Sequence, residues 1–187
     1  MILIGLGANL PTEQYGTPRA ALGAALDALG GEGVTVMRRS PWYESAPVPI
    51  SDQPWYVNGV AEIESGKTVH QLIATLLGIE ARVGRKRGVT NAARVLDLDL
   101  LVYGSQIISS VAENGVAATV PHPRMTERAF VMLPLKDICP NWCHPESNLG
   151  INQLIEALPE GQDTRKLDDA DGFCGTEWPG PLKTSHS

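Results

Sequence analysis

The chain lacks the features that mark most secreted and membrane-embedded proteins. Its 187 residues include only three cysteines, and an odd number argues against a secreted disulfide framework. No run approaches the roughly eighteen uninterrupted apolar residues of a membrane helix, and Met1 leads into an apolar strand pattern without a basic leader segment. We therefore expect a cytoplasmic protein with free thiols and no membrane segment.

Several common catalytic motifs are also absent. The sequence contains no GxxxxGKS/T and no GxGxxG, so neither a P-loop nor a Rossmann site is indicated. It contains no GxSxG, the motif that carries the serine of many hydrolases. The glycines of GLGAN, residues 5–9, are a weak candidate for a phosphate cradle, and close backbone packing explains them better. Cys139, Cys143 and His144 lie close together, but zinc ligands usually come as two pairs and there is no second pair.

The balance of charge is acidic. A formal net charge of −6 argues against general affinity for nucleic acid or anionic membranes. One segment departs from this balance, because residues 82–94, RVGRKRGVTNAAR, contain five basic residues and no acidic ones. An isolated basic run is usually a solvated loop. Its interpretation therefore depends on the residues around it.

Hydrophobic periodicity predicts one domain with interleaved strands and helices. The expected strands are residues 1–10, 33–40, 55–65 and 94–104, with short strands and turns in 105–125. The expected helices are 18–31 with Thr17 as N-cap, 68–84 with a capping box of Thr68 and Gln71, 126–138 with a weakening Pro134, and 148–158. Residues 40–54 are rich in proline and are expected to form a loop. Residues 1–158 form the predicted domain, and residues 159–187 form an irregular tail.

The connections between several strands are too short to hold a crossover helix. The sheet should therefore be antiparallel or mixed, and the fold class α+β. In the strand at 55–65, alternation places Tyr56 and Asn58 on one face. That face offers a flat aromatic surface and an amide that can pair with a heterocycle, although a strand tyrosine is more often ordinary core.

The segment RVLDLDLLVYG, residues 94–104, has the pattern of a buried strand that contains two carboxylates. The two-residue period of a strand places Asp97 and Asp99 on one face and the leucines on the other. Burying two like charges is costly unless they are paired, neutralised or bound to a cation. Mg²⁺ commonly takes one or two carboxylates together with substrate phosphates. A solvent-exposed edge strand would also accommodate the pair.

The basic loop leads directly into this strand. Its side chains Arg85, Lys86, Arg87 and Arg94 are therefore tethered near the two aspartates. Carboxylates that bind magnesium beside arginines that bind phosphate oxygens are the parts that phosphoryl transfer needs, since that chemistry depends on positioning and charge neutralisation. The combination favours a nucleotide-phosphate site over a solvated loop.

The same residues occur with further motifs in one order. LDLDLL follows the arginine-bearing loop, QPWYVNGVAEIE and an ESAPV loop precede it, and VPHPRMTERAFVMLPL follows it. In this combination the chain resembles the 6-hydroxymethyl-7,8-dihydropterin pyrophosphokinases of folate biosynthesis, from Ile2 to about Leu158. The resemblance implies a three-layer α/β/α arrangement with a central, mostly antiparallel sheet and a ferredoxin-like core. It also implies transfer of pyrophosphate from ATP to the pterin hydroxymethyl group, with release of AMP.

The resemblance further implies roles for individual residues. Asp97 and Asp99 would bind two Mg²⁺ ions, and Arg85 and Arg94 would act with them in catalysis. The ATP-binding residues would be Glu80, Arg87, Leu100, Thr119 and His122. The pterin-binding residues would be Ser45, Pro47, Val48, Tyr56, Asn58, Asp97 and Phe130, whose ring would stack on the pterin. ATP and the pterin are the expected partners, without nucleic acid or membrane, and a monomer is the starting expectation.

Two departures and two alternatives accompany this prediction. Many family members carry a tryptophan and Gly-Pro before the second arginine, where this chain has GVTNAAR, and Ala117 stands at an often basic position. These departures predict altered loop closure and ATP affinity, with the metal and arginine residues intact. A nucleotidyl transferase would also use paired aspartates and magnesium. A non-catalytic domain would use the basic loop to hold an anionic partner.

Overall fold

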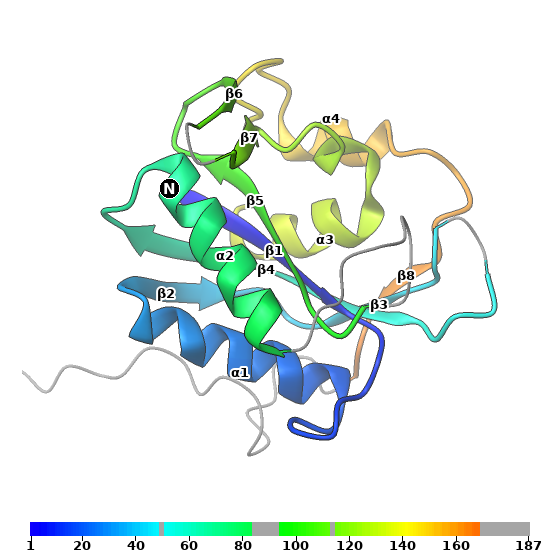
Figure 1. Ribbon diagram of the computed structural model, residues 1–187. Helices are drawn as coiled ribbons and strands as arrows, with labels where there is room; N and C mark the ends of the chain where they lie inside the picture. The colour runs from blue at the N-terminus through cyan, green and yellow to red at the C-terminus, as the bar shows by residue number, and fades with distance from the viewer. Residues whose placement is uncertain (49–50, 84–93, 113–114, 169–187) are drawn as a thin grey trace, which may run out of the picture.

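The computed structural model describes residues 1–48, 51–83, 94–112 and 115–168 (Figure 1). The strands are β1 (Ile2–Ala8), β2 (Val34–Arg39), β3 (Tyr43–Ser45), β4 (Tyr56–Ser65), β5 (Asp97–Tyr103), β6 (Ile108–Val111), β7 (Ala117–Val120) and β8 (Thr164–Lys166). The helices are α1 (Pro18–Gly31), α2 (Val69–Val83), the 3₁₀ turn η1 (Met125–Glu127), α3 (Ala129–Ile138) and α4 (Ile151–Glu156). Within these ranges every helix is too short or too polar to cross a bilayer.

The main sheet is antiparallel in every strand pair among the described residues. Its order is β5-β1-β4-β3-β8, and β2 pairs with β4 on the same edge as β3 but at the other end of the strand. A separate two-stranded sheet joins β6 and β7. The antiparallel α+β prediction is therefore confirmed. The sheet brings β1 between β5 and β4, so residues of all three strands lie side by side.

Helices cover both faces of the main sheet. α1 and α2 pack on one face, with Leu22, Leu26, Leu72 and Ile79 in a single buried cluster with side chains of β1 and β5 (Figure 1). α3 and α4 pack on the other face around a second cluster. Both predicted helix caps are present. Thr68 N–H donates to the side-chain oxygen Oε1 of Gln71 at 2.9 Å, and α1 begins directly after its N-cap Thr17.

A β-bulge in β5 sets which side chains reach which face. Leu3 lies opposite Val102 but Ile4 lies opposite Leu100, so Leu101 is an extra residue in β5. Leu100 packs with the α1–α2 cluster, whereas Leu101 and Val102 both join the α3–α4 cluster. A bulge of this kind interrupts the alternation at one point and leaves it intact on either side. The alternation predicted for Asp97 to Leu100 is therefore preserved.

Two short strands lie where the sequence predicts irregular chain. Residues 43–45, in the predicted loop, form β3 against β4, and residues 164–166, in the predicted tail, form β8 against β3. Three-residue strands carry no readable periodicity, and their pairing depends on partners distant in sequence. The predicted helix at 126–138 is divided into η1 and α3, and the last helix is shorter than predicted. The division of the chain at residue 158 stays a prediction.

Gly59 is required by the indole of Trp42, which is fully buried. A Cβ at this position would lie 2.8 Å from Cζ3 and 3.0 Å from Cε3 of Trp42. We expect Gly59→Ala to lower the free energy of unfolding by about 1–3 kcal/mol, the usual cost of overpacking. Gly78→Ala is the matched control, because an added Cβ there meets open space in α2 and should raise stability by up to about 1 kcal/mol. Urea unfolding measures both, and equal stabilities for the two variants would contradict the packing argument.

His144 makes stability depend on pH. Its side chain is buried, and Nδ1 accepts the N–H groups of Glu146 and Ser147, each at 3.3 Å. Burial lowers the pKa of His144, and the charge of Glu146 opposes this only in part. Below about pH 6.5 the unfolded chain takes up a proton that the folded protein resists, so the free energy of unfolding should fall as pH decreases. His144→Asn should weaken this dependence between pH 7.5 and 5.5, and identical slopes in the two proteins would contradict it.

Candidate active site

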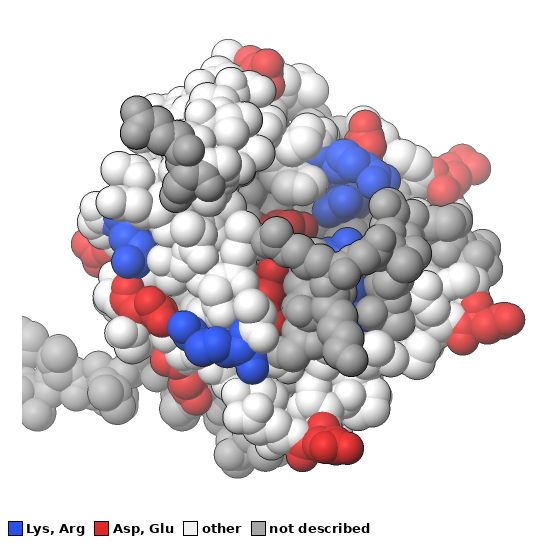
Figure 2. Space-filling view, viewed as in Figure 1, with Lys and Arg blue, Asp and Glu red and all other residues white. Residues whose placement is uncertain are grey.

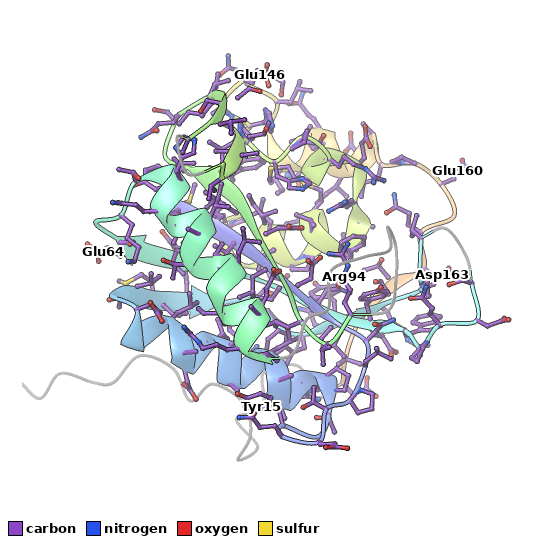
Figure 3. The ribbon with its side chains drawn as sticks, in the orientation of Figure 1. Tyr15, Glu64, Arg94, Glu146, Glu160 and Asp163 are labelled. Atoms are coloured by element: carbon purple, nitrogen blue, oxygen red, sulfur yellow. The ribbon has the colours of Figure 1, made fainter. Side chains whose placement is uncertain are left out.

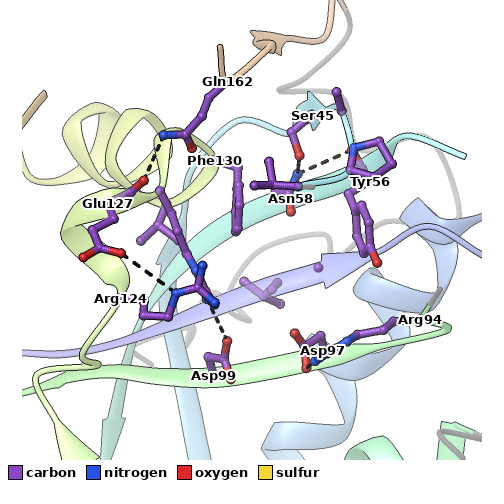
Figure 4. Close-up of a pocket in the computed structure, with 18 of the residues that line it drawn as sticks. Ser45, Tyr56, Asn58, Arg94, Asp97, Asp99, Arg124, Glu127, Phe130 and Gln162 are labelled. Carbon is purple, nitrogen blue, oxygen red and sulfur yellow. Dashed lines mark hydrogen bonds and ion pairs between the residues drawn. The ribbon is translucent and has the colours of Figure 1, made fainter. Parts of the chain in front are cut away.

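A cavity of about 440 Å³ lies on the α3 side of the sheet. Its walls come from β1, β4 and β5, from the loop after β3, from η1 and the start of α3, and from residues 159–162 (Figure 4). Figure 2 shows this side of the molecule as a hollow with Lys and Arg atoms at one edge and acidic atoms deeper inside. The lining thus combines apolar side chains with charged and amide groups, as a site for a polar ligand requires.

Glycines of the central strand form part of the cavity floor. Gly5 lies opposite Asp99 and Gly7 lies opposite Asp97 in the β1–β5 pairing. A Cβ on Gly7 would lie 3.4 Å from Asn58 Oδ1 and 4.0 Å from Asp97 Cβ. The missing side chains thus leave space between the polar groups of β4 and β5. The sequence interpretation of these glycines as a packing feature omitted this effect on the cavity.

The two aspartates of β5 face the cavity, as the alternation predicts. Arg94 Nη1 is paired with Asp97 Oδ1, and Arg128 Nη1 lies 3.7 Å from Asp99 Oδ2. Burial and the neighbouring Asp97 raise the pKa of Asp99, while His122 and the two arginines oppose the rise. The carboxylates are therefore partly neutralised by cations, as a like-charged pair in a low-dielectric position requires.

These carboxylates are also the best candidates for a metal site. They are two oxygen donors on one strand face at the base of a cavity with space above them. In the described part of the chain no group of three or more His, Cys, Asp or Glu is arranged to hold a metal. Two protein carboxylates completed by substrate oxygens are the arrangement that Mg²⁺ commonly accepts, so this donor set fits that ion.

Arg94 is held at its backbone by Asn9, which is buried at the end of β1. Arg94 N–H donates to Asn9 Oδ1 at 2.7 Å, and Asn9 N–H donates to the Arg94 carbonyl at 2.9 Å. Asn9 Nδ2 donates to the Pro54 carbonyl at 3.0 Å, just before β4. One side chain thus joins the chain entering β5 to the chain entering β4. Burial alone would lower the pKa of Arg94, but the charge and hydrogen bond of Asp97 outweigh it and raise that pKa.

The other side of the cavity carries aromatic and amide groups. Tyr56 and Asn58 face it from β4, and Phe130 faces it from α3 (Figure 4). Asn58 Nδ2 donates to Ser45 Oγ at 2.9 Å, which fixes the amide with Oδ1 over Gly7. Burial raises the pKa of Tyr56, with a partial opposing effect of Arg94. This half of the cavity can bind a flat, polar-edged ring.

Most of the predicted site residues therefore meet in one place. The cavity is lined by Ser45, Pro47, Val48, Tyr56, Asn58, Arg94, Asp97, Asp99 and Phe130. Arg85 and Arg87 lie outside the described residues. His122 is close by, with Nε2 at 4.0 Å from Asp99 Oδ2, and burial lowers its pKa although Asp99 opposes this.

None of the four predicted ATP-binding residues in the described part of the chain lines this cavity: besides His122, they are Glu80, Leu100 and Thr119. Glu80 is buried in α2, and its Oε1 accepts the N–H of Leu98 at 2.7 Å, between the two aspartates. Leu100 packs in the α1–α2 cluster, and Thr119 is exposed on β7. The structure gives Glu80 a role in holding the β5 backbone. The ATP contacts of these three residues stay predictions.

Sequence reasoning did not assign several cavity residues. They are Gly5, Gly7, Leu101, Arg124, Glu127, Arg128 and Gln162, among others. Two of them, Arg124 and Arg128, are cations that flank η1 within the motif PRMTERAF, which the sequence does show. Arg128 Nη1 lies 3.7 Å from Asp99 Oδ2, whereas Arg124 Nε lies 3.9 Å from Glu127 Oε2. Burial lowers the pKa of Arg128, and Asp99 opposes this. Gln162 carried no such signal, because it lies in the segment predicted as tail.

Comparisons with known proteins show what the chain is similar to. A family model described as 7,8-dihydro-6-hydroxymethylpterin-pyrophosphokinase (HPPK) matches residues 3–140. The chain is 38% identical over 158 residues to the 2-amino-4-hydroxy-6-hydroxymethyldihydropteridine pyrophosphokinase of Haemophilus influenzae, covering 84% of this chain and 92% of that protein.

Other relatives are much longer. The folic acid synthesis protein fol1 of Pneumocystis carinii is 33% identical over 157 residues, which cover 84% of this chain but only 20% of that protein. A crystal structure of a Plasmodium falciparum HPPK-DHPS triple mutant matches with a TM-score of 0.64 at 14% identity, covering 83% of this chain and 43% of that one. This likeness shows the fold, and the chain spans less than half of both proteins.

Proposed function

Because the chain belongs to the 7,8-dihydro-6-hydroxymethylpterin-pyrophosphokinase family, we propose that it transfers pyrophosphate from ATP to 6-hydroxymethyl-7,8-dihydropterin in folate biosynthesis. The observation that carries the proposal is the cavity itself, in which a paired carboxylate and arginine set faces an aromatic and amide set. One half suits a triphosphate and the other a pterin ring. The finer arrangement, three layers around a ferredoxin-like core, belongs to the same proposal.

The pterin is bound by the half of the cavity around Asn58. Phe130 and Tyr56 offer flat surfaces, and the fixed amide of Asn58 presents Oδ1 to a donor on the ring edge. The loop at Pro47 and Val48 closes the apolar side. Binding in this orientation directs the hydroxymethyl group toward β5, where the aspartates lie. Placing the alcohol beside the phosphate chain supplies much of the rate acceleration in such a reaction.

The phosphate half neutralises charge. In the reaction the hydroxymethyl oxygen loses its proton to water and forms a bond to the β-phosphorus, the bond from that phosphorus to the oxygen of the α-phosphate breaks, and AMP leaves with that oxygen. Asp97 and Asp99 would hold two Mg²⁺ ions, which when bound neutralise the triphosphate. Arg94 stabilises the charge that develops on the departing phosphate, and Arg85 and Arg87 act from the basic loop. Orientation and charge neutralisation supply the acceleration, and the step needs no general base from the side chains named here.

The decisive experiment identifies the products. The protein is mixed with ATP, Mg²⁺ and 6-hydroxymethyl-7,8-dihydropterin, and AMP and a diphosphorylated pterin are expected in equal amounts. Release of pyrophosphate with a nucleotidylated pterin would instead identify a nucleotidyl transferase. Nucleotide binding without either product would identify the non-catalytic alternative. Omitting Mg²⁺ with a chelator present should stop AMP formation, which tests the metal requirement separately.

A further inference from the structure

The chain crosses from one wall of the cavity to the other between residues 159 and 164, which we call the crossing segment. Residues 159–162 line the cavity. Figure 3 labels two of its residues, Glu160 and Asp163, which lie on the side of the molecule that carries β3 and β8. The segment lies beyond the part of the chain matched by the family model, which ends at residue 140.

On the first wall the crossing segment is held through the side chain of Gln162. Oε1 accepts the N–H of Ala129 at 2.9 Å, and Nε2 donates to the carbonyl of Glu127 at 2.9 Å (Figure 4). Nε2 also lies 3.3 Å from the carbonyl of Pro159, within its own segment. Both ends of this amide are thus used on the turn between η1 and α3.

On the second wall the same segment is held through its backbone. Ala46 N–H donates to the Asp163 carbonyl at 2.9 Å, and Thr164 lies opposite Ser45 in the β3–β8 pairing. Ser45 in turn accepts the hydrogen bond of Asn58. The crossing segment therefore joins the loop beside Asn58 to the turn that carries Phe130.

The turn needs this support. Arg128 is the N-cap residue of α3 and makes no side-chain cap hydrogen bond, so the first N–H of the helix, at Ala129, has its partner in Gln162. Unpaired N–H groups at a helix start are costly when they are removed from water. The residues on either side of Ala129 are Arg128, which faces Asp99, and Phe130, which faces the cavity. Fixing this N–H fixes the backbone from which both side chains project.

We propose that Gln162 is a positioning residue for the pterin half of the site: it holds the start of α3, and with it Phe130, in place while its own segment anchors the loop at Ser45. The inference rests on the proposed function and deepens it. It predicts that loss of the Gln162 amide weakens binding of the planar substrate more than binding of ATP. The physical reason is that both hydrogen bonds hold the wall that contacts the ring. On the phosphate side, Arg94 is held separately by its hydrogen bonds with Asn9.

The test compares Gln162→Ala with Gln153→Ala in the full chain. Gln153 is also a capping glutamine, whose Oε1 accepts the N–H of Gly150 at 3.0 Å, but it does not line the cavity. Dissociation constants are measured for 6-hydroxymethylpterin in the presence of Mg²⁺ and a non-hydrolysable ATP analogue, and for the analogue alone. Gln162→Ala should raise the pterin Kd about 10-fold, as expected for two lost hydrogen bonds, and change the nucleotide Kd less than about 2-fold. Gln153→Ala should change neither.

A partial replacement keeps the test informative if the alanine variant folds poorly. Gln162→Glu retains an acceptor for the Ala129 N–H but loses the donor to Glu127, so its pterin Kd should lie between those of wild type and Gln162→Ala. Unchanged pterin affinity in both Gln162 variants, or equal weakening of pterin and nucleotide, would overturn the inference while leaving the proposed function intact. A wild-type protein that binds no pterin and forms no AMP would overturn both.

Discussion

Asp97→Asn is expected to abolish AMP formation and leave the protein folded. The carboxylate lies at the base of the cavity beside Arg94, and the proposed reaction needs its negative charge to hold a divalent cation. The amide is nearly the same size, so the strand pairing of β5 with β1 should be maintained. Because metal ions contribute several kcal/mol to charge stabilisation in such reactions, the rate should fall by about 1,000-fold or more. Steady-state AMP production at saturating Mg²⁺ measures the loss, and Asp97→Ala should behave in the same way.

The control for this variant is Asp27→Asn, which removes an exposed carboxylate from α1 on the other face of the sheet. It should retain full activity. Urea unfolding of the wild type, Asp97→Asn and Asp27→Asn shows whether a loss of activity comes from the site or from unfolding. Full AMP production by a purified Asp97→Asn protein would show that the assignment of metal binding to Asp97 is wrong.

Arg94→Ala is expected to slow the chemical step far more than it weakens pterin binding. The guanidinium belongs to the phosphate half of the cavity, where its partner is Asp97, and the ring-binding groups lie on β4 and α3. Loss of one group that stabilises transition-state charge typically costs about 100- to 1,000-fold in rate. Single-turnover measurements should show a loss of this size, with the pterin Kd changed less than about 3-fold. Arg94→Lys should recover part of the rate, since the charge returns without the planar pair of donors.

Arg82→Ala is the matched control for the arginine. Arg82 lies at the end of α2, where it pairs with Glu32 at 2.8 Å on an exposed surface, and its removal should leave the single-turnover rate unchanged. If Arg94→Ala changed only substrate affinity, Arg94 would be a binding residue and the proposed role in catalysis would be wrong.

The sequence predicts those parts of the site that depend on one strand. Alternation alone places Asp97 with Asp99 and Tyr56 with Asn58, because the face of a strand residue follows from its number as long as no bulge intervenes. The bulge at Leu101 lies after both aspartates, so the prediction is unaffected. The resemblance then added Phe130 and the loop at residues 45–48, which periodicity could not connect to β4.

The parts that were missed depend on contacts distant in sequence. Gln162 enters the cavity because β8 pairs with β3, and neither strand has enough residues to show a pattern. Glu80 has a helical position and a carboxylate, and only the packing of α2 against β5 reveals that it accepts the N–H of Leu98. Such roles follow from tertiary geometry, which a single sequence does not encode in local spacing.

Two hydrogen bonds between Asn9 and Arg94 fix the backbone position of this arginine independently of the residues that precede it. The N–H and the carbonyl of Arg94 both bond to Asn9, directly after β1, so these contacts do not involve residues 84–93. We expect substitutions in that stretch to change the turnover rate without moving the backbone from which the Arg94 guanidinium projects. A chimera that carries the corresponding stretch of a relative should therefore keep the hydrogen bonds between Asn9 and Arg94.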